Sequence, residues 1–365
     1  MSDAFDIAVA GGGAAGIAAA VCAARAGCKT LLMDSRPGAG GTGGFSGLTT
    51  LCGLFDEDGQ FLNGGFSREF AEALAREDDA REPLKMGRVH VQLYRPASFQ
   101  KLAARWLEGE PRLSLRWETP LRDLRLEGPR ITGLNGARVA VVIDCTGTAE
   151  VGRASGEALL ETDETTQAPS VVFPLEHVER DLSAPVAVAP VLLALARAKF
   201  SPVSFMPTLE TGTVAVKFAG EPAEVPRWLK FLRADVPGFE RCGTAQQEFT
   251  YARRAGTMIV GRHVLTGDEV LGARKFPDAV ARASWPIEQW SPEGRPRVRY
   301  LKPGEFYEIP ARSLRAARTD NLFMAGKSLS ADVDAVASAR VMGSCLATGA
   351  AAGQLAADFV TSGGN

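Results

Sequence analysis

The most constraining feature of this chain is a glycine-rich turn that directly follows an apolar segment near its start. The apolar run Phe5 to Ala10 leads into Gly11-Gly12-Gly13-Ala14-Ala15-Gly16, and an alanine-rich segment that favours a helix comes next. This order matches G-x-G-x-x-G, in which Gly11 permits the tight turn, Gly13 lets a pyrophosphate approach the backbone and Gly16 lets helix and strand pack closely. The helix would direct free N–H groups and its partial positive charge at the phosphates. The turn therefore predicts a dinucleotide site, and the alternative is a glycine-rich turn without a ligand.

Further apolar runs indicate the sheet to which this turn belongs. Thr30 to Met33 ends at Asp34, where a carboxylate is expected to reach the hydroxyl groups of a ribose. The following stretch, Ser35 to Gly44, is too rich in glycine to predict a helix or a strand, and we expect a loop against which a flat, charged group lies closely. Residues 137–144 and 321–326 are apolar and indicate buried strands. The pattern predicts an α/β fold with a parallel sheet.

Composition narrows the class of protein. The 365 residues are 45% hydrophobic and 23% charged, enough for two domains or one elaborated domain. With 41 basic and 43 acidic residues the formal charge is −2, without the basic excess typical of proteins that bind nucleic acid or anionic membranes. Residues 7–24 carry no charge and could be mistaken for a signal peptide or a membrane span. Acidic residues precede this run where a signal peptide would be basic, and three glycines interrupt it where a spanning helix would be continuous, so we expect neither.

Cysteine and histidine spacing points to a reduced compartment and no metal. The six cysteines are irregularly spaced and form no C-x-x-C pair, and the three histidines are far apart in sequence. Disulfides, zinc and iron–sulfur clusters are therefore not indicated, and we expect a cytoplasmic protein with free thiols.

Periodicity predicts the remaining organisation. We expect strands at 89–94, 113–117, 121–126 and 213–218, and helices around 66–75, 96–107, 191–199, 276–283 and 338–359. The chain would divide into the first part of a Rossmann-like domain (1–160), a mixed α+β substrate domain without its own glycine fingerprint (161–305), and a return strand and helix (306–365). The arginine-rich stretch 295–299 reads as a solvated loop or strand edge.

Taken in order, several segments resemble the FAD-dependent oxidoreductases with a glutathione-reductase-like two-domain fold. The resemblance covers nearly the whole chain and is specific because of the order of its pieces, which are Gly11 to Gly16, Asp34 to Arg36, Gly40 to Gly44, Ile143 to Thr148, Gly261 to Thr266, Arg274 to Asp278, Tyr307 to Pro310, Asn321 to Gly326, and Ala339 to Met342. It implies non-covalently bound FAD and a small-molecule substrate held between two domains.

The resemblance also implies roles for individual residues. Asp34 would hydrogen-bond the adenosine ribose and Arg36 would lie over or beside the adenine, and Ser35 between them is also a cofactor-binding residue. The last helix would begin at Val341-Met342 and direct its positive end at the flavin pyrimidine, where reduced flavin carries negative charge. The other implied contacts, to the pyrophosphate and the ribityl chain, are Gly41, Thr42, Gly43, Thr146, Gly147 and Gly326.

Two positions depart from the pattern of this group. Many flavoproteins have Asp directly after the glycine equivalent to Gly326, whereas this chain has Lys327, so its ribityl contact is expected to differ. Disulfide reductases of this fold have paired cysteines after the first glycine loop, and here Cys52 stands alone. The sequence therefore argues against a dithiol reductase.

Four residues are candidates for the chemistry. Cys52 lies in the segment expected to approach the isoalloxazine, where a thiol could form a flavin adduct or relay electrons, and a packing residue is the alternative. His263 is a candidate base for hydride abstraction or a structural histidine. Tyr307 and Arg312 would orient a carboxylate-bearing substrate, since arginine offers two parallel donors.

Other polar and aromatic residues read as structural. Arg253-Arg254 read as a bridge between the two domains. The segment Trp285 to Trp290 has the tryptophans of a halogenase motif in the wrong order, so we interpret it as a strand or loop with aromatic packing.

The leading hypothesis is hydride transfer between a small organic substrate and FAD. One alternative is a monooxygenase, which must shield a flavin peroxide from water. Another is a non-catalytic FAD-binding assembly protein. An NAD-dependent dehydrogenase is disfavoured because the return strand and last helix match a flavin architecture. The electron acceptor stays open, as does the choice between a monomer and a homo-oligomer.

Overall fold

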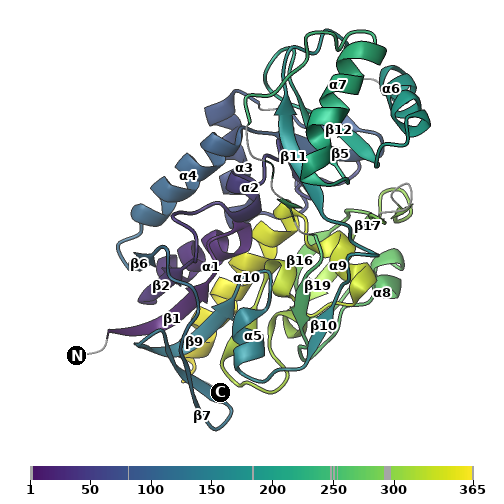
Figure 1. Ribbon diagram of the computed structural model, residues 1–365. Coiled ribbons are helices and arrows are strands. Elements are labelled where there is room, and N and C mark those ends of the chain that lie inside the picture. The colour runs from purple at the N-terminus through teal and green to yellow at the C-terminus, as the bar shows by residue number, and fades with distance from the viewer. Residues whose placement is uncertain are drawn as a thin grey trace.

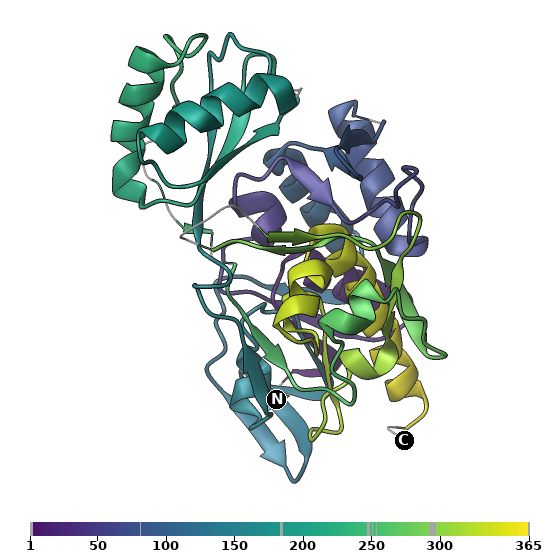
Figure 2. The ribbon, with the colours of Figure 1, turned by 90° about the vertical axis from the view of Figure 1, so that its right-hand side faces the viewer.

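The computed structural model describes residues 3–80, 82–182, 185–246, 249, 251–252, 254–291 and 297–363. They form a larger α/β body, which carries both chain ends, and a smaller unit that stands at the opposite end of the molecule (Figures 1 and 2). Arg253 and residues 295–296, which the sequence assigns to a bridge and to a solvated loop, lie outside the described residues.

A parallel sheet forms the centre of the larger body. In the described ranges it has seven strands, and β20 pairs with the carboxyl half of β9. The strands follow the order β6 (Leu113–Arg116), β2 (Thr30–Met33), β1 (Ala4–Ala10), β9 (Ala137–Asp144), β8 (Arg130–Leu134), β7 (Leu124–Glu127), with β20 (Leu322–Met324) beside β9. The pairs among β6, β2, β1, β9 and β20 are parallel, whereas β7 and β8 form an antiparallel hairpin. This sheet confirms the predicted fold class.

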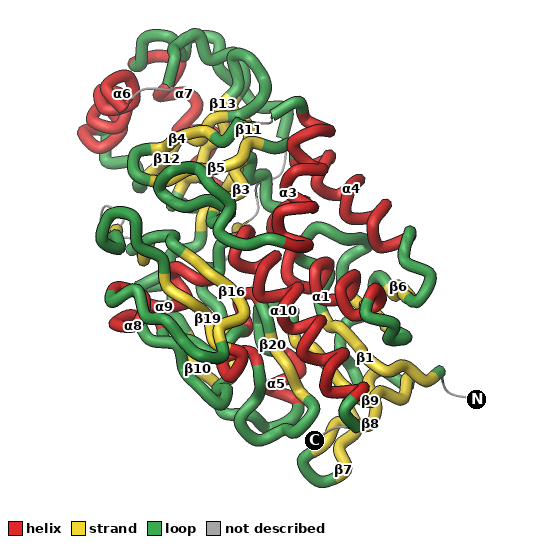
Figure 3. The backbone as a smooth tube through the Cα atoms, turned by 180° about the vertical axis from the view of Figure 1, so that it is seen from behind, coloured by secondary structure: helices red, strands yellow, loops and turns green. Residues whose placement is uncertain are grey.

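Two helices rich in small residues cross in direct contact on one face of this sheet. They are α1 (Ala14–Arg25) and α10 (Met342–Thr361), which lie side by side in Figure 3. A Cβ atom added at Gly349 would come within 2.1 Å of the Ala15 carbonyl oxygen, and one at Gly353 within 2.4 Å of the Ala19 oxygen. Glycine at these two positions is therefore what lets the first and last helices approach so closely.

Aromatic packing joins two further helices beyond α1. These are α3 (Gly65–Asp78) and α4 (Pro96–Glu108). Phe70 of α3 packs edge-on against Phe99 and Trp106 of α4, with ring centres 5.1 and 5.4 Å apart.

The smaller unit has an apolar core of its own. Its antiparallel sheet has the order β12 (Val203–Pro207), β13 (Val214–Phe218), β11 (Ser170–Leu175), β14 (Tyr251–Ala252), and it is joined by α6 (Pro185–Arg197) and α7 (Val225–Asp235). The core runs from Val171 to Cys242 and surrounds the buried Trp228. Residues from 258 to 301 contribute instead to the core of the larger body. The predicted domain limits at 160 and 305 stay predictions.

Short elements complete the larger body and border the smaller unit. One small sheet consists of β3 (Thr50–Cys52), β5 (Val89–Leu93) and β4 (Leu84–Met86). The remaining elements are α2 (Gly41–Phe45), α5 (Glu150–Ala154), β10 (Leu159–Glu161) with β15 (Thr257–Ile259), α8 (Gly267–Leu271), β16 (Ala279–Ala283) with β19 (Tyr307–Pro310), β17 (Ile287–Gln289) with β18 (Arg297–Arg299), and α9 (Val333–Ala339).

Two sequence predictions of secondary structure are wrong. Residues 279–283 form a strand and not part of a helix, because they pair with residues 307–310 of β19. Residues 41–45 form a helical turn within the predicted loop. Gly43 and Gly44 pack there against Phe99 and Gln100, where a Cβ atom would come within 2.7 and 2.4 Å of those side chains. In both places tertiary contacts override local propensity.

Of the described helices, none alone has the length and apolar composition of a membrane span. Helices α9 and α10 meet that test together, but the chain bends by 95° between them.

Candidate active site

The predicted cofactor residues come together at the carboxyl edge of the parallel sheet. Ala10 pairs with both Met33 and Asp144, and Met324 also pairs with Asp144. Four strands therefore end side by side, and the residues that follow them include Gly11, Asp34, Thr146 and Gly326. Such an edge is where ligands bind in open α/β sheets.

The glycine turn is packed at two of its three signature positions and open at the third. A Cβ atom at Gly11, where φ is +101°, would lie 2.4 Å from the Cys145 carbonyl oxygen, and one at Gly16 would lie 1.7 Å from the Gly11 oxygen. At Gly13 the nearest atom would be 3.8 Å away. Gly13 is also the N-cap residue of α1 and provides no side-chain cap, which leaves the helix N-terminus to an external group. These features fit a pyrophosphate.

Asp34 holds the glycine turn and the segment after β2. Its Oδ2 accepts a hydrogen bond of 2.5 Å from the Gly12 N–H, and its Oδ1 accepts one of 2.7 Å from the Arg36 N–H. Ser35 and Arg36 are exposed beside it, and the Arg36 guanidinium lies 5.5 Å from the ring centre of Phe45. Sequence reasoning missed Trp117, whose ring lies against Gly12. The signal for it was an aromatic residue directly after β6, at the same edge of the sheet.

The second glycine loop folds onto the first. A Cβ atom at Gly41 would come within 2.6 Å of the Gly13 Cα, and Gly43 is buried against Phe99. Thr42 is exposed, and its carbonyl accepts a hydrogen bond of 2.6 Å from the Ser46 hydroxyl. The two loops together form a glycine-lined cradle of the kind that a phosphate chain needs.

At the end of β9, a buried carboxylate fixes the loop that follows the strand. Asp144 accepts hydrogen bonds from the Thr146 hydroxyl (2.7 Å) and the Val151 N–H (2.9 Å), and burial raises its pKa. The Gly147 N–H donates to the Ser328 hydroxyl at 3.1 Å. Lys327 packs its chain against Gly147, and burial lowers the pKa of its amine to about 8. A cation therefore lies where many flavoproteins have an aspartate.

The first turn of α10 borders the segment that contains Cys52. Val341 begins this helix without a side-chain cap, and the buried Ser344 hydroxyl has no hydrogen-bond partner among the described residues. A Cβ atom at Gly53 would come within 2.4 Å of Val341 Cγ2, so the backbone after Cys52 touches the helix start. Gly326 likewise approaches the Ala15 Cβ, which a Cβ of its own would meet at 2.8 Å. An uncapped helix end with an unsatisfied hydroxyl fits the pyrimidine side of a flavin.

The structure gives Cys52 a protected environment. Its Sγ lies 3.9 Å from the Thr50 carbonyl and hydroxyl oxygens. Burial, reinforced by the charge of Glu288, raises the pKa of the thiol to about 12. All six cysteines lie within the described residues, and none forms a disulfide.

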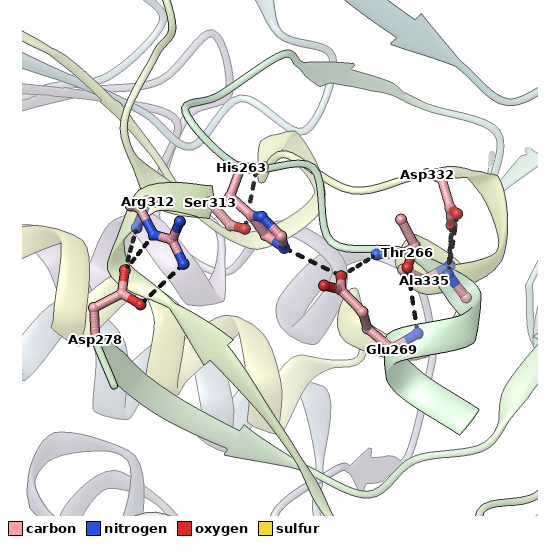
Figure 4. Close-up of polar contacts among 9 residues, drawn as sticks. His263, Thr266, Glu269, Asp278, Arg312, Ser313, Asp332 and Ala335 are labelled. Atoms are coloured by element: carbon pink, nitrogen blue, oxygen red, sulfur yellow. Dashed lines mark hydrogen bonds and ion pairs between the residues drawn. The ribbon is translucent and has the colours of Figure 1, made fainter. Parts of the chain in front are cut away.

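The other three catalytic candidates lie among α8, α9 and β19. His263 shares a hydrogen bond of 3.1 Å with Glu269, whereas the exposed Arg312 pairs with Asp278 at 3.0 Å, so the two side chains point to different carboxylates (Figure 4). Tyr307 is completely buried, its hydroxyl lies 2.8 Å from the Ser338 hydroxyl, and burial raises its pKa. Each has a structural partner, and their catalytic roles stay predictions.

A partly buried ion pair lies instead between the smaller unit and the Cys52 segment. Lys217 Nζ from β13 lies 3.7 Å from Glu288 Oε1 of β17, and 3.8 Å from the ring centre of Trp290. The indole N–H groups of Trp290 and Trp285 donate to the two Glu288 oxygens at 2.5 and 3.3 Å. Burial lowers the pKa of Lys217 to about 8, while the pKa of Glu288 is lowered by Lys217 against the effect of burial. The tryptophans thus orient a carboxylate as well as packing.

Two arginines extend this cluster. Arg254 lies 4.9 Å from the ring centre of Trp290 and donates to the Ala168 carbonyl and the Ser170 hydroxyl, both at 2.7 Å. Arg340, two residues before α10, donates to Gln167 Oε1 at 2.8 Å. Sequence reasoning read Arg254 as structural and missed Lys217, Glu288 and Arg340 as site residues. The signal for Lys217 was a charged residue inside an apolar strand.

Comparisons with known proteins agree with this geometry. A family model described as FAD dependent oxidoreductase matches residues 6–208 and 209–364. No functionally curated protein matches the chain in sequence.

Several solved structures share the fold at low identity. A geranylgeranyl bacteriochlorophyll reductase-like protein from Thermoplasma acidophilum is 14% identical with a TM-score of 0.55, and the match covers 99% of this chain and 80% of the other. GidA of Aquifex aeolicus is 13% identical with a TM-score of 0.56, and the match covers 99% of this chain and 64% of GidA. The p-nitrophenol 4-monooxygenase PnpA of Pseudomonas putida DLL-E4 is 12% identical with a TM-score of 0.51, and the match covers 99% of this chain and 82% of PnpA. At such low identity, this structural likeness shows a common fold alone.

The family match spans almost the whole chain, and its cofactor is FAD, as the resemblance in sequence implies. The open Gly13 position, the Gly41 loop and the uncapped start of α10 suit that cofactor. The chain belongs to the family of FAD dependent oxidoreductases.

Proposed function

We propose that this protein transfers a hydride between a small organic substrate and non-covalently bound FAD, at the place where the Lys217–Glu288 pair, the Cys52 segment and the first turn of α10 meet. The observation that carries the proposal is the partly buried amine of Lys217 paired with Glu288, because a lysine with a pKa of about 8 can gain and lose a proton near neutral pH. When bound, FAD supplies the site that takes up the two electrons of the hydride.

The surrounding residues suit a proton acceptor. As a C–H bond of the substrate gives up its hydride, an O–H or N–H proton leaves, and the Lys217 amine takes it. Glu288, fixed by the indole N–H groups of Trp285 and Trp290, stabilises the ammonium that results. The start of α10, uncapped by any side chain, stabilises the negative charge that develops in the reduced state.

Anaerobic mixing of the FAD-loaded protein with a panel of small alcohols and amines tests the proposal, with loss of flavin colour as the readout. Lys217→Met is expected to slow bleaching by about 10²–10⁴-fold, the usual contribution of general base catalysis. In the wild type the rate of bleaching rises with pH towards a plateau above pH 8, and this rise disappears in the variant. Added methylamine is expected to restore part of the rate in Lys217→Ala.

Other outcomes would identify a different reaction. Oxygen consumption that matches the formation of a hydroxylated product identifies a monooxygenase. FAD that no electron donor can reduce identifies a non-catalytic flavoprotein.

A further inference from the structure

The Arg340 guanidinium lies beside the Arg254 backbone, and both guanidinium groups have N–H donors to spare. Arg340 Nη1 lies 3.5 Å from the Arg254 carbonyl oxygen, and each guanidinium carries five N–H donors. Among the described residues their hydrogen-bond acceptors are neutral oxygens, those of Ala168, Ser170, Gln167 and Arg254 itself. The Arg340 Nε–H is buried and has no partner within the described part of the chain.

The charges of this cluster do not balance. Three cations, Lys217, Arg254 and Arg340, all interact with one carboxylate, that of Glu288, which leaves a net charge of about +2 among these four described residues when all are ionised. Burial and, to a smaller extent, the neighbouring Arg340 together lower the pKa of Arg254 to about 10. A buried cation without a counter-charge is costly, so the cluster is built to receive an anion from outside the chain.

We propose that Arg254 and Arg340 form an anion subsite that seats a carboxylate group of the substrate beside the Lys217–Glu288 pair. This inference rests on the proposed function, because it places the substrate within the same site. A planar guanidinium presents parallel N–H groups that match the two oxygens of a carboxylate. The carboxylate would replace the missing counter-charge and leave the reacting carbon of the substrate near the start of α10.

The position of the arginines favours a substrate anion over the cofactor phosphates. Arg254 is held by Ala168 and Ser170 at the start of β11, in the smaller unit, and it lies over Trp290. Lys327 packs against Gly147 at the strand ends and also against Gly256, and its Nζ donates to the Ala255 carbonyl at 3.3 Å, so it lies between the strand ends and Arg254. Arg254 therefore reaches the cluster from the smaller unit, whereas Lys327 reaches it from the strand ends.

The test measures binding to oxidised, FAD-loaded protein, so it needs no turnover. Acetate, benzoate and succinate are titrated by calorimetry, each beside its neutral amide, and inorganic phosphate is added as a fourth anion. At least one acid is expected to bind tenfold more tightly than its amide. Arg254→Met and Arg340→Met are each expected to weaken the binding of that acid at least tenfold, while Arg254→Lys recovers part of the lost affinity.

Matched controls separate the subsite from general loss of charge or fold. Arg241→Met removes an exposed arginine of the smaller unit that pairs with Glu179, and it should leave the affinity unchanged. FAD content and thermal unfolding are measured for every variant. Where Arg254→Met does not fold, Arg340→Met and Arg254→Lys still decide the question.

Four results would overturn the subsite. These are equal affinity for acid and amide, unchanged affinity in folded arginine variants, tighter binding of phosphate than of every acid, and absence of saturable binding by all three acids. A shift in flavin reduction potential without any change in acid binding would assign the arginines to the cofactor instead. If acids bind through Arg254 but no substrate bleaches the FAD, the subsite stands and the proposed function fails.

Discussion

Gly41 lies directly against Gly13, and a Cβ atom at position 41 would come within 2.6 Å of the Gly13 Cα. This contact joins the two glycine loops that are separated by a helix and a strand in the sequence. Gly41 also has φ +50°, a conformation that costs other residues about 1 kcal/mol.

Gly41→Ala is therefore expected to push the two loops apart and to weaken the binding of FAD about tenfold or more. Tenfold corresponds to about 1.4 kcal/mol in the free energy of binding. Quenching of flavin fluorescence on titration into apoprotein measures the affinity. Gly38→Ala is the control, since it lies in the same segment and a Cβ atom there would meet nothing within 4 Å. Equal affinities in the two variants would contradict the role of the Gly41–Gly13 contact.

Gly349→Ala is expected to destabilise the fold. The added methyl group would lie 2.1 Å from the Ala15 carbonyl oxygen, so α1 and α10 must separate, at a cost of about 1–3 kcal/mol in the free energy of unfolding. Urea unfolding of the apoprotein measures the change. Gln354→Ala, at an exposed position of the same helix, should change stability by less than about 0.5 kcal/mol. A Gly349→Ala protein as stable as the wild type would show that the helices do not cross at these residues.

Lys217→Met is expected to change how stability depends on pH. Burial lowers the pKa of Lys217 from 10.5 to about 8, in the presence of Glu288, Arg254, Cys52 and Arg340. Between these values the unfolded chain holds a proton that the folded chain lacks, so the stability of the wild type rises with pH relative to the variant.

The difference between the two proteins should shift by about 1–3 kcal/mol from pH 7 to pH 10. Urea unfolding across this range measures it in the apoprotein. Lys230→Met, which removes the same charge from an exposed position of α7, is measured alongside. A difference that stays constant with pH would mean that Lys217 is not held in the buried pair.

Cys52 is expected to behave as an unreactive lining residue. With a thiol pKa of about 12, only about one molecule in ten thousand carries the thiolate at pH 8, and the thiolate is the reactive form. Cys52→Ala should therefore reduce its FAD at a rate within about threefold of the wild type, the effect of a packing change alone. Mass spectrometry should find the Cys52 peptide free of iodoacetamide label until the protein is unfolded in urea. Rapid labelling of Cys52, or loss of flavin reduction in Cys52→Ala, would contradict this expectation and support a redox role for the thiol.

The cofactor half of the site was predictable because its signals are local. Gly11 and Asp34 follow directly after a strand, and Thr146 and Gly326 come two residues after the end of one. The strands of a parallel sheet end at one edge, so a strand pattern already places these residues together. The start of the last helix at Val341-Met342 followed from the same resemblance, and the helix indeed begins at Met342.

The polar cluster beside it was not predictable in the same way. Lys217, Arg254, Glu288 and Arg340 come from four distant segments, and each reads in isolation as an ordinary strand, loop or helix-end residue. They meet because Lys217 of β13 pairs with Glu288 of β17, and β17 packs against α9, which directly precedes Arg340. No periodicity in the sequence encodes these contacts.

By itself, then, the sequence determined the α/β class, the FAD family and the strand ends that would hold the dinucleotide, because glycine spacing and strand patterns act through neighbouring residues. Only the tertiary structure decided that residues 279–283 pair as a strand, that His263 and Arg312 have carboxylate partners, and that Lys217 faces Glu288. These outcomes depend on burial and on contacts between distant segments, and such contacts exist only once the chain has folded.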